Sequence, residues 1–77
     1  MPRVLQVAGF EIYIFTHDHI PPHVHVFRGG DEAIIVIENG DVRESYMSRR
    51  DLREARRIIE EHRGFLLQRW QEIGPVP

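Results

Sequence analysis

A β-hairpin decides the fold of this chain. It lies in residues 23–38, which read HVHVFRGGDEAIIVIE. Valine alternates with histidine and phenylalanine before Gly29-Gly30, and an apolar run follows that pair, as in two half-buried strands. The glycine pair is a signal for a two-residue hairpin loop. We therefore predict strands at His23–Arg28 and Asp31–Glu38.

The alternation of side chains along these strands divides the hairpin into two faces. With the glycine pair as the loop, Arg28 lies opposite Asp31, and His25 lies opposite Ile34. One face then carries His23, His25, Phe27, Glu32, Ile34 and Val36. The other face is more apolar and carries Val24, Val26, Ala33, Ile35 and Ile37. We expect a helix to cover the apolar face and to leave the histidine face open to solvent, a substrate or a second subunit.

Two strands are predicted before the hairpin, at Arg3–Val7 and Phe10–Phe15. Both are rich in β-branched and aromatic residues, and Ala8-Gly9 forms the turn between them. Residues 16–22 then form a loop. Its Pro21-Pro22 pair lacks amide hydrogens and stiffens the entry to the next strand.

A last strand is predicted at Asp41–Tyr46. The preceding Asn39-Gly40 pair is the strongest hairpin signal in the chain, because both positions tolerate positive φ. In that register Arg43 lies opposite Val36.

The hydrophobic period changes to that of a helix after Ser48. Ser48 followed by Asp51 resembles a capping box and marks the helix start. Gly64 predicts a bend or a break into two helices, and Gly74-Pro75 ends the helix. The apolar stripe of the helix comprises Leu52, Ala55, Ile59, His62, Leu66, Trp70 and Ile73, widened by Ile58 and Phe65.

Strands first and a helix last predict an α+β fold. We expect an antiparallel β-meander of four to five strands, followed by a C-terminal helix that is bent or broken near Gly64 and packed on one sheet face. Residues 1–77 suffice for a single domain. A core this small is marginal alone, so pairing with a second copy or a partner protein is expected.

Composition narrows the classes of function. The chain has no cysteine, which excludes disulfides and thiolate zinc sites. No apolar stretch approaches the roughly 20 residues that span a bilayer, and no signal-peptide features are seen, so we expect a cytoplasmic protein without a membrane segment. A net charge of −2 gives no global attraction to nucleic acid. All ten basic residues are arginine, which reflects either a GC-rich genome or selection for bidentate donors.

Four histidines lie within nine residues: His17, His19, His23 and His25. One hypothesis is a transition-metal site for zinc or nickel, because His23 and His25 point the same way from a strand and Glu32 or Asp18 could add a carboxylate.

A second hypothesis is acid–base catalysis on RNA. Here His23 and His25 would move protons, Glu32 would orient or share a proton, and Arg43 would hold phosphate. A third interpretation is structural, in which the histidines order the loop through hydrogen bonds or line an interface. His62, on the helix stripe, is expected to be a hydrogen-bonded core residue.

Arginines also gather on the predicted helix. Five of them project within about a third of its circumference: Arg49, Arg50, Arg53, Arg56 and Arg57. They predict either a strip that binds RNA or DNA phosphate, a dock for an acidic partner, or a solvated face neutralised by Glu60 and Glu61.

Several sequence features occur together in one known family. They are Met1-Pro2 before a β run, the Phe10–Phe15 strand, the segment His19-Ile20-Pro21-Pro22-His23-Val24-His25, the Arg50-Asp51-Leu52 helix start, and Glu61-His62-Arg63 followed by Trp70. On these features nearly the whole chain resembles short bacterial proteins of the domain of unknown function 4160 family.

The resemblance implies that His19, His23 and His25 are motif positions, without assigned roles, whereas His17 is less general to the motif. It also implies a gene beside that of another small domain of unknown function, the two being suspected to form a toxin–antitoxin-type module. We therefore expect one component of such a module, which works through a small partner protein and acts on RNA. The alternative is a non-catalytic binding module whose histidines hold a metal or respond to pH.

Overall fold

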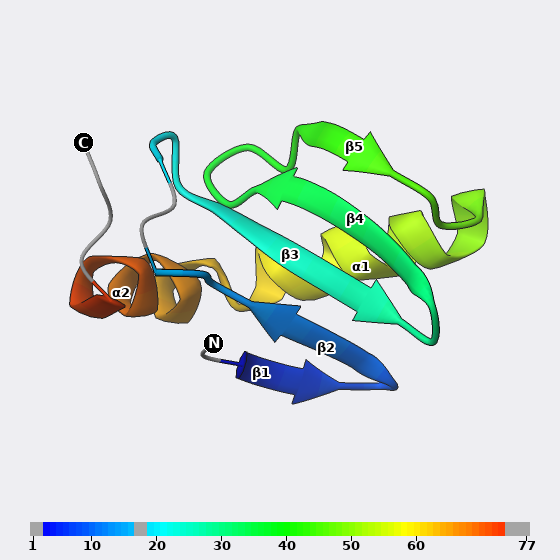
Figure 1. Cartoon of the computed structure of the whole chain (residues 1–77), viewed down its shortest axis with the longest axis horizontal. Helices are drawn as coiled ribbons and strands as arrows, with labels where there is room; N and C mark the ends of the chain where they lie inside the picture. The colour runs from blue at the N-terminus through cyan, green and yellow to red at the C-terminus, as the bar shows by residue number, and fades with distance from the viewer. Residues whose placement is uncertain (1–2, 17–18, 74–77) are drawn as a thin grey trace.

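The computed structural model describes residues 3–16 and 19–73, and in it a sheet precedes two helices (Figure 1). The elements are β1 (Arg3–Val7), β2 (Phe10–Tyr13), β3 (His23–Arg28), β4 (Asp31–Val36), β5 (Val42–Ser45), α1 (Arg49–Glu61) and α2 (Arg63–Ile73). The strands lie in the order β1-β2-β3-β4-β5, and each pairs antiparallel with its neighbour. The α+β meander expected from the sequence is confirmed.

The central hairpin has the predicted register. His25 pairs with Ile34, and Arg28 pairs with Asp31 across Gly29-Gly30. The turn between β1 and β2 uses positive φ at both Ala8 (52°) and Gly9 (83°), which suits the twist of a two-residue hairpin.

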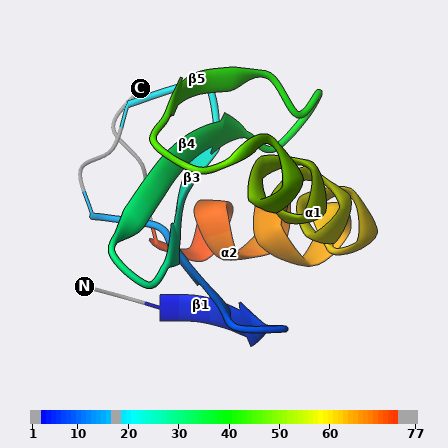
Figure 2. The same cartoon turned by 90° about the vertical axis from the view of Figure 1, so that its right-hand side faces the viewer.

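One face of the sheet and the two helices share a single core. α1 runs behind the sheet in Figure 1, and Figure 2 shows it beside β3 and β4 from the end. The inward residues of the central hairpin are fully buried, as the alternation predicted: Val24, Val26, Ala33, Ile35 and Ile37. They belong to the same apolar cluster as Ala55, Ile58 and Ile59 of α1 and Leu66 and Trp70 of α2.

The predicted register of Arg43 opposite Val36 is wrong. Val36 donates its N–H to the carbonyl of Asp41 (2.8 Å) and accepts from Gly40 N–H (2.9 Å), so the loop holds four residues rather than two. The pairs are Ile35 with Val42 and Ile34 with Glu44, and Arg43 is the extra residue of a β-bulge.

Ile37 leaves the β4–β5 ladder at the start of this longer loop. Its side chain is fully buried, and its N–H donates to the carbonyl of Pro22 (3.0 Å) instead of to β5. β4 therefore ends at Val36 rather than Glu38, and β5 covers only Val42–Ser45. At the other side of β3, β2 ends at Tyr13 rather than Phe15.

The predicted break in the helix is confirmed, but it falls at His62 rather than at Gly64. α1 ends at Glu61, His62 has φ −112° and ψ 19°, and its Nδ1 lies 2.9 Å from the carbonyl oxygen of Ile58. The ring is half-buried rather than in the core. Ser48 caps α1 as predicted, accepting from Asp51 N–H at 3.1 Å.

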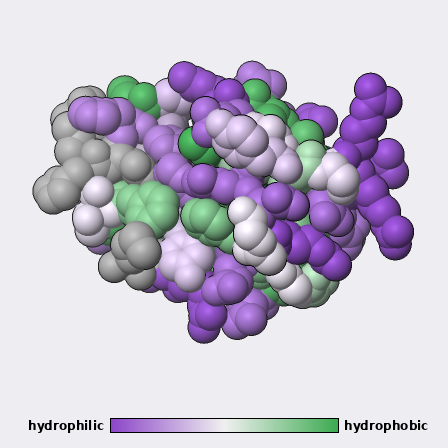
Figure 3. All heavy atoms as spheres, turned by 45° about the vertical axis from the view of Figure 1, so that its right-hand side comes forward, coloured by the Kyte–Doolittle hydropathy of each residue, from purple (hydrophilic) through white to green (hydrophobic). Residues whose placement is uncertain are grey.

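Phe65 does not widen the buried stripe, because its side chain is 44% exposed. Neither helix in the described ranges is long and apolar enough to cross a membrane. Figure 3 shows hydrophilic residues over most of the side it presents, interrupted by small apolar patches.

Candidate functional site

A row of aromatic rings crosses the sheet face opposite the core. The ring centroids are 5.5 Å apart for Phe27 and Tyr13, 6.0 Å for Tyr13 and Phe15, 4.4 Å for Phe15 and His25, and 5.4 Å for His25 and His23. β2 and its extension supply Tyr13 and Phe15, and β3 supplies the others. We call these five residues the ring row. It shows that the two histidines belong to one packed aromatic layer.

His25 is held by a carboxylate. Its Nδ1 lies 3.1 Å from Oε2 of Glu32 on the neighbouring strand, and the two side chains are 14% and 33% exposed. An ionised carboxylate only accepts, so Nδ1 carries the hydrogen and, in a neutral ring, Nε2 carries the lone pair. That Nε2 atom is buried. The bond therefore fixes the ring and its tautomer, but a substrate would not reach the basic nitrogen from solvent.

His23 is held in the same way by a backbone carbonyl. Its Nδ1 donates to the carbonyl oxygen of Pro21 at 2.9 Å, which again assigns the lone pair of the neutral ring to Nε2. The ring centroid lies 5.4 Å from that of Trp70, so α2 supports it from the side. The peptide bond between Ile20 and Pro21 is cis.

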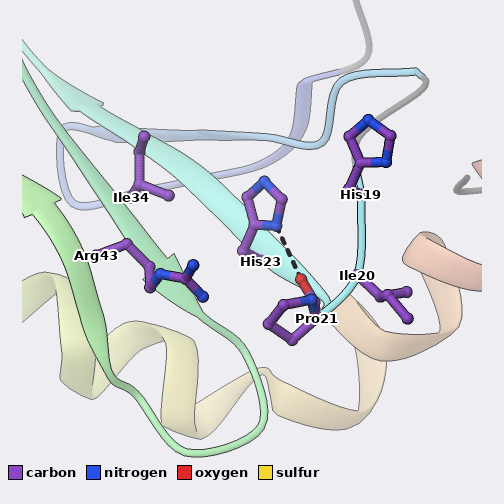
Figure 4. Close-up of a pocket in the computed structure, with 6 residues that line it drawn as sticks. All are labelled: His19, Ile20, Pro21, His23, Ile34 and Arg43. Atoms are coloured by element: carbon purple, nitrogen blue, oxygen red, sulfur yellow. Dashed lines mark hydrogen bonds between the residues drawn. The ribbon is translucent and has the colours of Figure 1, made fainter. Parts of the chain in front are cut away.

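A shallow pocket of about 270 Å³ opens beside His23 (Figure 4). Its lining comes from the loop before β3 and from β3, β4 and β5: His19, Ile20, Pro21, His23, Ile34 and Arg43. Arg43 extends from β5 toward the same hollow as the His23 ring in Figure 4. The pocket thus combines two imidazoles and one guanidinium, and none of the carboxylates in residues 3–16 and 19–73 lines it. Its charge suits a phosphate group.

The bulge in β5 takes part in this arrangement. Arg43 is exposed, is the unpaired residue of the bulge and lines the pocket, although the register expected from the sequence was wrong. Bulges commonly re-aim one side chain near a site. The sequence therefore placed Arg43 near the histidines, but with the wrong strand register.

The residues predicted for catalysis divide into two groups. His23 and Arg43 meet at the pocket, whereas His25 and Glu32 form the adjacent pair and do not line it. His19, which was predicted as a metal ligand, also lines the pocket. Sequence reasoning did not assign a role to Tyr13, Phe15 and Phe27. The alternation Glu11-Ile12-Tyr13-Ile14-Phe15 carries the signal, since it places Tyr13 and Phe15 on the face opposite the buried isoleucines.

No group of three or more metal-ligating side chains gathers within residues 3–16 and 19–73. His17, predicted as a metal ligand, and Asp18 lie outside the described residues. The zinc or nickel site accordingly stays a prediction.

The five arginines of α1 fall into two rows. Arg57 is paired, with Glu54 on one side and with Glu61 at 2.6 Å on the other. The Glu54 bond raises the pKa of Arg57, and the Arg57 hydrogen bond lowers the pKa of Glu54. Arg50 lies beside Asp51 and Glu54 around a hollow at the helix start, which Arg53 also lines.

The second row, Arg49, Arg53 and Arg56, is exposed and makes no salt bridge with any described residue. Its members follow at intervals of four and three residues and share one side of the helix. Arg53 and Arg56 line two hollows of about 270 and 250 Å³. Arg49 lines the first, and Arg57, Glu60, Arg63 and the Asn39-Gly40 turn complete the second. We call Arg49, Arg53 and Arg56 the unpaired arginine row. Of the two ion pairs expected to neutralise this face, Arg57 with Glu61 is formed. Arg56 and Glu60 form no salt bridge among the described residues.

No curated protein and no solved structure matches this chain significantly. One protein family does match, over residues 9–71, a range that includes the histidine segment, both helix starts and the whole ring row. On this match the chain belongs to the family described as Domain of unknown function (DUF4160).

Proposed function

We propose that the protein is one component of a toxin–antitoxin-like two-gene module, which works through a small partner protein and cleaves RNA. The expectation of a partner comes from the family resemblance. The single observation that supports the RNA target is the pocket in which His19, His23 and Arg43 converge. Metal-independent RNA cleavage needs two proton shuttles and a cation on the phosphate, and this pocket has residues of those kinds.

In the proposed reaction, Nε2 of His23 accepts the proton of a ribose 2′-hydroxyl. The 2′-oxygen attacks the adjacent phosphorus, and the bond from phosphorus to the 5′-oxygen breaks. Protonated His19 donates a proton to that leaving oxygen, so the products are a 2′,3′-cyclic phosphate and a 5′-hydroxyl. Arg43 stabilises the charge that develops on the phosphoryl oxygens.

The hydrogen bond from His23 to Pro21 supports this role. Because Nδ1 is engaged with the carbonyl oxygen, proton transfer would use Nε2. His25 and Glu32 then act as a positioning pair, since their bond fixes the ring that packs against His23. The unpaired arginine row would supply further contacts to RNA phosphate.

The test compares two histidines in similar settings. In His23→Asn, the amide can still donate to the Pro21 carbonyl, but the second ring nitrogen is lost. His62→Asn is the matched control, because His62 also contacts a backbone carbonyl at 2.9 Å and lies outside the pocket. We expect His23→Asn to lose at least about 100-fold in RNA cleavage and to stop inhibiting growth, as for removal of a general base. His62→Asn should retain both activities.

A second pair of variants tests the cation. Arg43→Gln should reduce cleavage strongly, whereas Arg69→Gln, which breaks a 2.7 Å salt bridge to Glu72 on α2, should not. Cleavage that survives in both His23→Asn and Arg43→Gln would contradict the proposed reaction. Co-purification of the neighbouring gene's product with the full chain would support the module, and its absence from the purified chain after co-expression would count against it.

The alternative function is a metal- or pH-responsive binding module. One observation favours it: His23 engages its Nδ1 with a backbone carbonyl, as metal-ligating histidines usually do. Protein purified without an affinity tag should then bind zinc or nickel stoichiometrically. Trp70, the only tryptophan, lies 5.4 Å from His23, so its fluorescence should change on metal addition. No bound metal and no change in fluorescence or melting temperature would exclude this alternative.

A further inference from the structure

A second hollow lies on the same sheet face as the histidine pocket and plays no part in the proposed reaction. Its volume is about 320 Å³, and it is lined by Glu11, Tyr13, Phe15, Phe27 and Gly29. Three of these residues belong to the ring row, which runs on without a gap to His25 and His23. The ring row therefore connects the two hollows through stacked, edge-on and tilted ring pairs.

The three rings that line the second hollow form a corner, with two nearly parallel rings and one perpendicular to them. Tyr13 and Phe15 are nearly parallel, with 18° between their planes, while Phe27 stands at 90° to Tyr13. All three side chains are half-buried, so they pack against their neighbours and still reach the surface. A flat ring that enters this corner stacks on one face and meets the next ring edge-on, the two arrangements that aromatic pairs prefer.

A carboxylate supplies the polar edge of the corner. Glu11 is 41% exposed, and its Oε1 accepts from Arg3 and from the hydroxyl of Tyr13, each at 3.2 Å. Its position is therefore set, and Oε2 makes no hydrogen bond with a described residue. A carboxylate repels phosphate but accepts from the N–H groups on the Watson–Crick edge of a base.

We infer that this corner binds an unpaired base of single-stranded RNA, with guanine preferred because it presents two adjacent N–H donors to Glu11. The inference rests on the proposed function and specifies its substrate as single-stranded. Phe27 and His23 are four residues apart on β3, roughly 13 Å at the rise of a strand. The bound base and the phosphate at His23 and Arg43 would therefore belong to nearby nucleotides of the same RNA strand.

Duplex RNA does not fit this site. Bases that are paired and stacked keep their faces and Watson–Crick edges inside the helix, whereas unpaired bases can splay onto aromatic side chains. A protein partner is the other class of occupant, and the experiment separates the two.

The probe is a fluorescein-labelled 2′-O-methyl oligoribonucleotide of about seven nucleotides, either all uridine or with one central guanosine. The methyl group blocks the attacking 2′-oxygen, so binding is measured in the full chain without cleavage. Fluorescence anisotropy gives the Kd for wild type, Tyr13→Leu, Phe27→Leu and Glu11→Gln. Phe65→Leu is the matched control, because Phe65 is an exposed ring on α2.

We expect Tyr13→Leu and Phe27→Leu each to weaken binding about tenfold, and Phe65→Leu to leave it unchanged. The guanosine probe should bind more tightly than the uridine probe, and Glu11→Gln should remove that difference. Circular dichroism melts establish that each variant is folded, and the two ring variants are independent of each other.

Unchanged affinity in a folded Tyr13→Leu or Phe27→Leu, or equal affinity for a duplex of the same sequence, would overturn the inference. So would loss of partner co-purification in these variants with RNA binding intact, which would assign the corner to the partner. The proposed reaction fails separately, through cleavage that persists in His23→Asn.

Discussion

Nδ1 of His25 and Oε2 of Glu32 lie 3.1 Å apart across the β3–β4 hairpin, on the face opposite the core. The bond is nearly inaccessible on the histidine side, which is 14% exposed, and more open on the glutamate side, at 33%. It fixes the ring that packs between Phe15 and His23. The pair therefore positions the His25 ring, which packs against His23 of the pocket, but neither His25 nor Glu32 lines the pocket.

Replacing Glu32 tests this connection. Glu32→Gln keeps the size of the side chain but exchanges a charge-assisted hydrogen bond for a neutral one, so we expect a loss of about 1 kcal/mol in the free energy of unfolding. Urea denaturation at neutral pH measures it. The control is Glu44→Gln, an exposed residue on β5, which should change stability by less than about 0.5 kcal/mol. Equal effects of the two changes would show that the bond to His25 contributes nothing.

The two arginine rows of α1 should differ in RNA binding. Arg53→Gln and Arg56→Gln should each weaken binding and reduce the slope of log K against log salt by about 0.7, the contribution of one phosphate contact on a single strand. Arg57→Gln should leave the slope unchanged, because Glu54 and Glu61 already engage that guanidinium. A salt titration of oligonucleotide binding measures all three. A slope that responds as strongly to Arg57→Gln would contradict the division into rows.

Two glycines should respond to alanine with opposite signs. Gly64 lies in the first turn of α2, and an added methyl group would contact nothing within 4 Å, so Gly64→Ala should stabilise the protein by about 0.5 kcal/mol. Gly40 has φ +75° in the β4–β5 loop, so Gly40→Ala should destabilise it by about 1 kcal/mol. Thermal melts of both variants measure the signs. Stabilisation by Gly40→Ala would contradict the positive φ.

Acid should remove the contribution of the Glu54 carboxylate to the stability of the folded protein. The Arg57 hydrogen bond lowers the pKa of Glu54 below its usual value of 4.5, so the carboxylate favours the folded state above that value and loses its contribution as pH falls through the lower, folded pKa. We therefore expect Glu54→Gln to be less stable than wild type at neutral pH and equal to it in strong acid. Chemical denaturation from pH 7 to about 2 measures the difference. A difference that grows on acidification would reverse the sign of the shift.

Local pattern was enough for the central hairpin. Alternation assigned Val24, Val26 and Ile35 to the buried face, because strand faces repeat every two residues. Gly29-Gly30 set the register, because a two-residue loop fixes which residues of the two strands pair. The cap at Ser48 followed from its own spacing to Asp51. These features depend on neighbours in sequence, which is why they could be predicted.

The pocket depended on contacts between distant segments. The N–H of Ile37 bonds to the carbonyl of Pro22, and this bond lengthens the loop that local signals placed at Asn39-Gly40. The resulting bulge carries Arg43 to the pocket. No pattern within the last strand contains that information, because the partner of Ile37 lies in the segment before β3.

By itself, then, the sequence determined the order of the strands, the buried and open faces of the hairpin and the presence of histidines on the open face, since these follow from short periods and turn residues. Only the tertiary structure decided which histidine meets Arg43, that Glu32 holds His25, and that Tyr13, Phe15 and Phe27 join the histidines in one ring row. The physical reason is that such contacts depend on the register between strands and on which apolar side chains are buried. Both depend on the packing of the whole core.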